Sequence, residues 1–323
     1  MAVQNIKIND VLVDDSRFSL EDYLFPFAPE QTCHITSFDA FGILDPIILF
    51  KDDEKRLHLV DGLKRVHFAI LNKERIIRAT VLPPNTPVTN LITLILCNKR
   101  YEIEYSTINK IQFIYFATSL NAPEPWVLQS LCIPFEFKPH RDIFRECERI
   151  YNLPKELKLF CHDKKFSHKQ LLNLTYHPKD LLSQLIKWKS VMQFTASTLD
   201  EIASNLKNYL KRENKKIGDF LSEPDILELF DSSLGPREKT EKLRHLIHLK
   251  QFPVLSDKNA KIQKAVDALK LPKGLQVSWD NTLENKNVNV SVNIHDPLMW
   301  KAILDTLSSD EVKKAIESIL DEL

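Results

Sequence analysis

The sequence predicts a multidomain protein that combines an α/β N-terminal domain, an all-α middle domain and a small α+β C-terminal domain. Three observations support this prediction. The chain has 323 residues, which exceeds the roughly 250–300 residues over which a single hydrophobic core usually grows. Short β-branched runs alternate with helical patterns in the first third, and amphipathic helical patterns follow. A pair of strands with a turn between them appears near the end of the chain.

The first domain is expected over residues 1–104. Strands are predicted in the runs IKINDVLV, DPIILF, LHLV and IIRATVLP, with the short segment TSFDAFG and the helix LKRVHFAILNK between them. This alternation of short strands and helices is typical of a small α/β domain.

A helical domain is expected over residues 105–215. STINKIQFIYFATSL has helical spacing, PEPWVLQSLC follows a proline-bounded break, and PHRDIFRECERIYNLP extends from Pro139, a first helical position, to Pro154. Three helices in such close succession are a helix-turn-helix candidate. Capping boxes at Ser167–Gln170 and Thr198–Glu201 predict two further helix starts.

The remaining chain is expected to hold a linker and a third domain. Residues 216–240 are polar and contain two glycines and two prolines, which predicts a linker with a short helix at DILELF. Residues 241–323 predict a small α+β domain, with two helices, a hairpin with strands near Leu275–Trp279 and Val288–Ile294, and two closing amphipathic helices.

Composition gives little information about function. Lys+Arg and Asp+Glu both number 44, so any nucleic-acid or membrane surface must be local. No apolar run approaches the ~20 residues that cross a bilayer, and the N-terminal residues lack the apolar core of a signal peptide. The five cysteines, including Cys33, show no C-x-x-C spacing. We therefore expect a reduced, cytoplasmic protein with no membrane partner.

The stretch LHLVDGLKRVHFAIL, residues 57–71, places one of only five glycines between a predicted strand and a predicted helix. A helix start presents unpaired N–H groups and about half a positive charge, which suits a phosphate. Lys64 and Arg65 in the first turn are unfavourable for the helix dipole unless an anion compensates them. The alternative is an ordinary Asp61–Gly62 turn followed by a solvated basic pair. Walker-type and G-x-G-x-x-G loops are absent.

A second candidate site lies in the predicted helix PHRDIFRECERIYNLP. Three arginines recur there at a spacing of four behind two further basic residues, which gives a candidate DNA-binding set: Lys138, His140, Arg141, Arg145 and Arg149. A basic stripe of this kind can enter a major groove. Acidic residues interleave with the arginines at Asp142, Glu146 and Glu148. Pairing within the helix would leave a solvated face with little net field, which is the alternative.

The order of these motifs resembles the ParB family, chromosome-partitioning and nucleoid-occlusion proteins whose N-terminal domain has a sulfiredoxin-like fold. Its motif G-[VI]-L-x-P-I-[IL]-[VL] is matched by Gly42–Leu49, and its G-E-R-R-x-x-A by Gly62–Ala69. LILCNKR, which ends in Arg100, stands where the family has E-N-x-Q-R, and Ile150–Leu157 matches L-x-L-P-x-x-[LV]. The resemblance covers roughly residues 5–212, and residues beyond about 240 resemble no family that we can name.

The resemblance implies a DNA-binding protein that responds to a nucleotide, CTP with Mg²⁺, in chromosome or plasmid partitioning or in transcription-type regulation. The phosphate-binding residues that it implies are Gly62, Leu63, Lys64, Arg65 and Arg100. Leu63 replaces the acidic residue of the family's turn, and Leu96 and Cys97 replace the glutamate and asparagine of its second motif. Because Mg²⁺ prefers oxygen ligands, we expect anion binding without hydrolysis, no catalytic residues and no separate metal site.

Two other functions remain open. The same fold can serve as an interaction or regulatory module that has lost the nucleotide switch and DNA binding, which agrees with the neutral net charge. A small-molecule kinase on the same fold, with Asp61 beside the turn, is a more remote alternative. A homodimer would follow the family habit, and DNA binding would associate the protein with the nucleoid.

Overall fold

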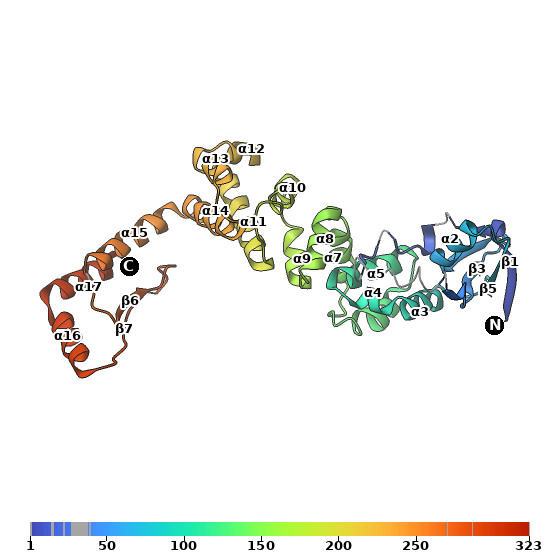
Figure 1. Ribbon diagram of the computed structural model, residues 1–323, viewed down its shortest axis with the longest axis horizontal. Helices are drawn as coiled ribbons and strands as arrows, with labels where there is room; N and C mark the ends of the chain where they lie inside the picture. The colour runs from blue at the N-terminus through green and yellow to red at the C-terminus, as the bar shows by residue number, and fades with distance from the viewer. Residues whose placement is uncertain are drawn as a thin grey trace. The chain divides into compact units, whose positions relative to one another are not determined.

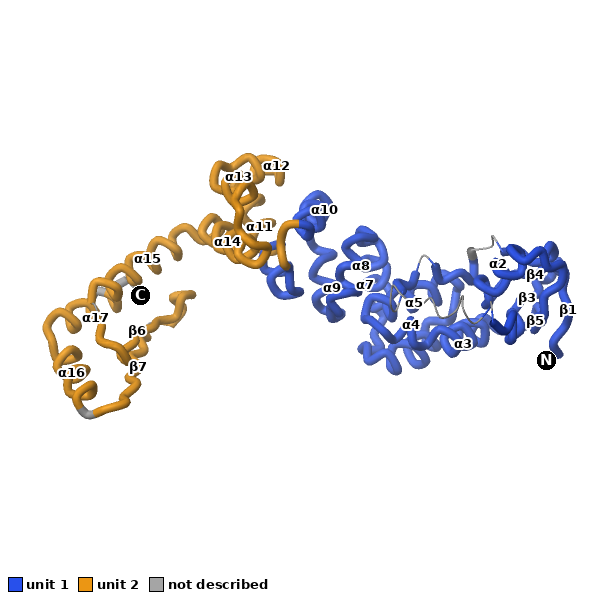
Figure 2. The backbone as a smooth tube through the Cα atoms, viewed as in Figure 1, with its two compact units in different colours: residues 1–190, 194–203 blue, residues 191–193, 204–323 orange. Residues whose placement is uncertain are grey.

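The computed structural model describes residues 2–13, 16–21, 23–26, 38, 40–269, 271–285 and 287–322. The chain divides into two compact units, which Figure 2 colours separately. The first unit comprises residues 1–190 and 194–203, and the second comprises residues 191–193 and 204–323. Cys33 and the first residues of the TSFDAFG segment, for which we had sequence-based expectations, lie outside the described residues.

A mixed sheet of five strands opens the first unit (Figure 1). The strands are β1 (Val3–Lys7), β2 (Val11–Leu12), β3 (Ile47–Lys51), β4 (Leu57–Asp61) and β5 (Ile76–Leu82), in the order β1-β5-β3-β4-β2. The β3 strand is antiparallel to β4 and parallel to β5, while β1 is antiparallel to β5 and β2 is parallel to β4. Short 3₁₀ helices flank β2, namely η1 (Ile8–Asp10) and η2 (Ser16–Phe18). All four predicted strand runs are present, and the first is divided into β1, η1 and β2.

Helix α2 (Leu63–Leu71) connects β4 to β5 and packs on this sheet. Its Val66 and Ala69 are fully buried against Ile47 and Leu49 of the central strand β3. Burying an aliphatic side chain of this size contributes about 1.5–3 kcal/mol. The direction of α2, and therefore the position of its first turn, is fixed by apolar packing.

A helical region follows within the same unit. Its elements are α3 (Val88–Asn98), α4 (Arg100–Glu104), α5 (Thr107–Ser119), α6 (Glu124–Val127), the π-helical turn η3 (Leu128–Cys132), α7 (Asp142–Tyr151), α8 (Lys155–Asp163), α9 (His168–Leu174), α10 (Lys179–Trp188) and the start of α11 (Ala196–Arg212). Residues 204–212 of α11 belong to the second unit. Apolar residues are buried around most of α5, including Ile108, Ile111 and Phe113, and a helix that is apolar on most sides belongs in a core. Helices α6, α7, α8 and α9 contact α5, which is the centre of this region.

Of three predicted helix starts, one agrees with the structure and two differ. The capping box at Ser167 and Gln170 is confirmed. The one at Thr198 is wrong, because Thr195 and Thr198 exchange side-chain-to-backbone hydrogen bonds and the helix starts one turn earlier. Helix α7 starts at Asp142 rather than at Pro139.

A short N-terminal segment joins the sheet to the helical region through polar contacts. The side chain of the fully buried Asn109 pairs with both backbone groups of Phe25, at 3.0 Å each. The Gln112 amide donates to the carbonyl of Tyr23, and Nε2 of His162 lies 3.1 Å from that of Pro26. Since unpaired buried backbone groups are costly, these contacts fix the segment on α5 and α8.

The second unit contains α12 (Ile217–Leu221), α13 (Pro224–Asp231), α14 (Pro236–Gln251), α15 (Pro253–Ala268), β6 (Leu275–Trp279), β7 (Val288–Val292), α16 (Pro297–Ser308) and α17 (Asp310–Glu322). Strands β6 and β7 form the expected antiparallel hairpin. The stretch expected as a linker, residues 216–240, holds two helices with Phe220 and Ile226 fully buried. Its prolines, which we took as breaks, occupy the first helical positions of α13 and α14. The division into four parts remains a prediction.

None of the helices in the described part of the chain is both long and apolar enough to cross a membrane.

Candidate functional site

The turn between β4 and α2 is the first candidate site. Gly62 caps the helix with φ 110° and ψ 23°, a left-handed conformation that favours glycine. A Cβ atom at this position would lie 2.7 Å from Cγ2 of the buried Ile47. Gly62 is therefore required by the backbone and by packing against β3, whether or not a ligand binds.

The start of α2 presents free backbone donors. The first helical hydrogen bond runs from the amide of Val66 to the carbonyl of Gly62, at 3.0 Å. The amides of residues 63–65 come before this hydrogen bond, and the helix offers them no carbonyl acceptor. Gly62 has no side chain that could accept from them. This arrangement suits an oxyanion.

The two cations of the first turn have different environments. The Arg65 guanidinium donates to Oδ2 of Asp61 at 2.6 Å and to the carbonyl of Pro46 at 2.5 Å. Its side chain is only 20% exposed and that of Asp61 15%. Lys64 is exposed, and no hydrogen bond or ion pair to it occurs within the described part of the chain. Arg65 therefore already has a partner, while Lys64 is available to an anion.

Asn98 is a neighbour of the turn that our sequence analysis missed. Its Nδ2 atom lies 3.4 Å from Oδ2 of Asp61, at the C-terminal end of α3. In the sequence comparison, Cys97 occupies the position of the asparagine in the ParB-family motif, and Asn98 is the next residue. This one-residue offset was the only signal in the sequence. The other predicted residue of this region, Arg100, lies on α4 and pairs with Oε1 of Glu104 at 3.0 Å. The Arg100 side chain is 66% exposed.

The turn fits a phosphate group better than a metal ion. Lys64, the free amides of the first turn and the Asn98 amide supply donors, which is the chemistry that holds phosphate oxygens. The nearby carboxylate of Asp61 is engaged by Arg65. Within the residues that the structure describes, no group of three or more His, Cys, Asp or Glu side chains could hold a metal ion. The donors of this turn therefore match the oxygens of an anion.

The second candidate site is the outer face of α7. Ile143, Cys147 and Ile150 are fully buried, on the side that contacts α5. Arg145 and Arg149 are exposed on the other side, together with Arg141 directly before the helix. The sequence period therefore predicted correctly which side of α7 is basic.

Two of the three arginines, Arg141 and Arg149, contact side chains outside α7. Nε of Arg141 lies 3.7 Å from Oε2 of Glu124, and the Arg149 guanidinium lies 4.2 Å from the ring centroid of Tyr176. Arg145 makes no ion pair within the described residues. None of the three pairs with the interleaved acids Asp142, Glu146 and Glu148 in that part of the chain. An exposed pair such as that of Arg141 contributes little, so these charges remain available.

Glu146 faces a histidine rather than an arginine. Its Oε2 lies 3.2 Å from Nε2 of His168, although the two groups are not aligned as a hydrogen bond. Burial lowers the pKa of His168, and this effect outweighs the neighbouring carboxylate. The histidine is therefore neutral near pH 7 and adds no positive charge beside Glu146.

The connection before α7 is longer than in a typical helix-turn-helix. Residues 133–141 join η3 to α7, whereas the typical turn has about three or four residues. Lys138 and His140 lie in this connection and are exposed. They extend the basic surface beyond the N-terminal end of the helix.

Comparisons with known proteins show weak similarity to solved structures. No family model matches the chain, and no curated protein matches it. Among solved structures, the chain is similar to the C-terminally truncated chromosome-partitioning protein ParB from Caulobacter crescentus, complexed with CTP-γ-S. The identity is 11%, and the match covers 57% of this chain and 98% of that chain with a TM-score of 0.25.

We predict that Gly62→Ala destabilises the β4–α2 turn by about 2–4 kcal/mol, because it combines a positive φ with a clash against Ile47. Hydrogen exchange read by mass spectrometry on peptides from residues 57–71 measures the effect. Gly218→Ala is the control, since a Cβ there meets nothing within 4 Å, and its own peptides should change by less than about 1 kcal/mol. Unchanged protection in Gly62→Ala would contradict the packing argument.

We predict that Asp61→Asn strengthens the binding of inorganic triphosphate, measured by calorimetry without divalent metal. The substitution removes the carboxylate that holds Arg65, so that Arg65 joins Lys64 in contacting the anion. Affinity should rise about tenfold, the value of one charge-assisted hydrogen bond. Asp180→Asn, which makes the same charge change on the exposed start of α10, should bind as the wild type does. Weaker binding by Asp61→Asn would show that the carboxylate supports the ligand instead.

Proposed function

We propose that this chain is a ParB-like DNA-binding protein in which α7 contacts DNA and the Gly62 turn binds the phosphates of a nucleotide such as CTP. The observation that carries the proposal is the exposed row of Arg141, Arg145 and Arg149, whose charges are not neutralised by the acidic residues of their own helix. Chromosome or plasmid partitioning, or transcription-type regulation, is the cellular role proposed with it. A homodimer remains part of the proposal.

The dimensions of a helix suit a DNA groove. An α-helix with its side chains is about 10–12 Å across, and the major groove of B-DNA is about 12 Å wide. Lys138 and His140 precede the helix, where the helix dipole also favours a phosphate. The arginines would therefore contact phosphates or guanine edges, with the two preceding residues on the backbone.

The Gly62 turn supplies the proposed response to a nucleotide. Lys64 and the free amides of α2 would hold the phosphates. An approaching phosphate would compete with Asp61 and the Pro46 carbonyl for Arg65, and release of Arg65 would loosen the connection between α2 and the loop before β3. Leu63 supplies no carboxylate, so we propose binding without hydrolysis.

A second function is favoured by one specific observation. Arg65 already has a carboxylate and a carbonyl as partners without any ligand. If this bridge is permanent, the turn is structural, and the chain is an interaction or regulatory module without a nucleotide switch. Calorimetry on the turn distinguishes this alternative from the nucleotide-binding function.

Electrophoretic mobility of a random-sequence DNA duplex over a salt series tests DNA binding. We predict that the wild type retards the duplex at low salt and that Arg145→Ala weakens retention at every salt concentration. The slope of log affinity against log salt should fall by about 0.9 for each phosphate that the variant no longer neutralises. Lys187→Ala removes a cation from the exposed side of α10 and should leave both retention and slope unchanged. Absence of retention at low salt would exclude the DNA-binding function.

A further inference from the structure

Helix α9 lies beside α7, and the two helices contact each other (Figure 1). At the start of α9, the ring centroid of His168 lies 5.2 Å from that of Phe137, and its Nε2 lies 3.2 Å from Oε2 of Glu146 on α7. In the turn after the end of α9, Tyr176 lies against Arg149 of α7. The exposed side of α9 therefore continues the basic face of α7.

We infer that α9 and the turn after it form a second part of the DNA-contact surface, in which Tyr176 orients Arg149 and Lys169 contacts a backbone phosphate. The inference rests on the proposed DNA-binding function and deepens it, because neither Tyr176 nor Lys169 belongs to the basic set that the sequence indicated. It is carried by the contact between Arg149 and Tyr176 and by the charge of the exposed side of α9.

The guanidinium of Arg149 is held by an aromatic ring rather than by a carboxylate. Its Cζ atom lies 4.2 Å from the ring centroid of Tyr176, within the roughly 6 Å over which a ring face attracts a cation. Within the described residues, Arg149 makes no ion pair and donates no hydrogen bond. Because the ring attracts the charge without accepting a conventional hydrogen bond, the N–H groups of Arg149 remain available to phosphate or guanine oxygens.

The position of the Tyr176 ring is set by the chain on both sides of it. Leu174 is fully buried and His177 is 8% exposed, so the turn is anchored in the core before and after the tyrosine. The Tyr176 amide donates to the carbonyl of Asn173 at 3.0 Å. The tyrosine itself is 55% exposed. The ring is therefore held in place while it remains on the surface, where it can hold a cation that faces a ligand.

Restraint of Arg149 before DNA arrives favours binding. A long arginine side chain loses rotamer entropy when it is fixed on a ligand. The contact with Tyr176 already restricts this side chain in the free protein, so less entropy remains to be lost on DNA. Tyr176 is thus a positioning residue, and Arg149 is the group that contacts DNA.

The exposed side of α9 adds positive charge of its own. Residues 164–179 contain four lysines and neither aspartate nor glutamate. Lys169 is exposed, and no ion pair to it occurs in the part of the chain that the structure describes. It stands about two helical turns before Tyr176, whereas Leu171 and Leu174 of the same helix are fully buried. Lys169 and Tyr176 therefore share the solvent-facing side of α9.

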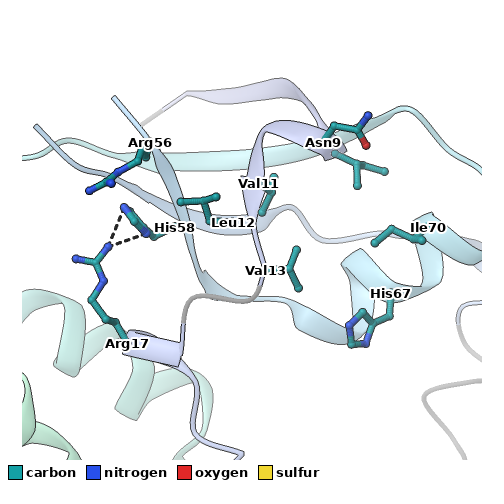
Figure 3. A pocket seen from close by; sticks show the side chains of 10 residues that line it. Asn9, Val11, Leu12, Val13, Arg17, Arg56, His58, His67 and Ile70 are labelled. Carbon is teal, nitrogen blue, oxygen red and sulfur yellow. Dashed lines mark hydrogen bonds between the residues drawn. The ribbon is translucent and has the colours of Figure 1, made fainter. Parts of the chain in front are cut away.

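This surface is open, unlike the cavity of about 720 Å³ beside β2. Figure 3 shows that cavity, in which a terminal nitrogen of Arg17 lies 2.7 Å from Nδ1 of His58. No residue of α7 or α9 lines it. A small molecule requires an enclosed site of that kind, whereas a DNA duplex contacts an extended row of charges. The exposed side of α9 therefore suits a duplex.

A double-mutant cycle on binding to a random-sequence DNA duplex tests the role of Tyr176. Fluorescence anisotropy over a salt series gives the affinities of the full chain, Tyr176→Leu, Arg149→Gln and the double variant. We expect Tyr176→Leu to weaken binding about two- to fivefold, the effect of an exposed cation–π contact. The salt slope should not change, because no charge is lost. In the Arg149→Gln background, Tyr176→Leu should have no further effect.

Three variants complete the test. Tyr176→Phe keeps the ring and should bind as the wild type does. Lys169→Ala should weaken binding and lower the salt slope by about 0.9, the value of one phosphate contact. Tyr101→Leu is the matched control, since it removes a tyrosine that is 86% exposed on α4, and it should bind as the wild type does.

Three results would overturn the inference while the proposed function stands. In the first, Tyr176→Leu has no effect or weakens binding equally with and without Arg149. In the second, Tyr176→Phe binds no better than Tyr176→Leu, and in the third, Lys169→Ala keeps the wild-type slope. Absence of DNA binding by the wild type overturns the proposed function and the inference together, so the two failures are distinguishable.

Discussion

The bridge from the Arg65 guanidinium to the Asp61 carboxylate and the Pro46 carbonyl is the interaction on which the N-terminal region depends. It joins the end of β4, the first turn of α2 and the loop before β3, while Gly62 allows the backbone to pass directly over Ile47. Because α2 is also fixed by its buried Val66, the Gly62 turn takes its geometry from this helix, with Lys64 at its start.

The sequence predicted the strand runs and α2 because these depend on local hydrophobic period, which a single chain reveals. It also predicted the tight turn at Gly62. It could not predict the partners of Arg65 and Asp61, since Pro46 and Asn98 are distant in sequence and become neighbours only through the pairing of β3 with β4 and the packing of α3. The short helix at DILELF was predicted and is α13, but α12 was missed. The prolines that begin α13 and α14 were taken as breaks, because proline marks both breaks and helix starts.

The outer face of α7 shows how tertiary structure decides between two local interpretations. In the sequence, the interleaved acids allowed pairing within the helix as readily as a free basic stripe. In the structure, Arg149 lies over Tyr176 and Glu146 faces His168, both from residues C-terminal to the helix. Arg145 stays exposed, and it forms no ion pair with Glu148 within the described residues. The DNA-binding proposal therefore depends on contacts that no local charge pattern contains.

Calorimetric titration with CTP tests the central claim that the Gly62 turn holds phosphate through Lys64. The account predicts that the wild type and Lys187→Ala bind CTP with equal affinity and that Lys64→Ala binds about tenfold more weakly, since it lacks one charged group that faces the phosphate. Equal binding by the wild type and Lys64→Ala, or no binding of CTP by the wild type, would contradict the account and leave the Arg65 bridge as a purely structural feature of the turn.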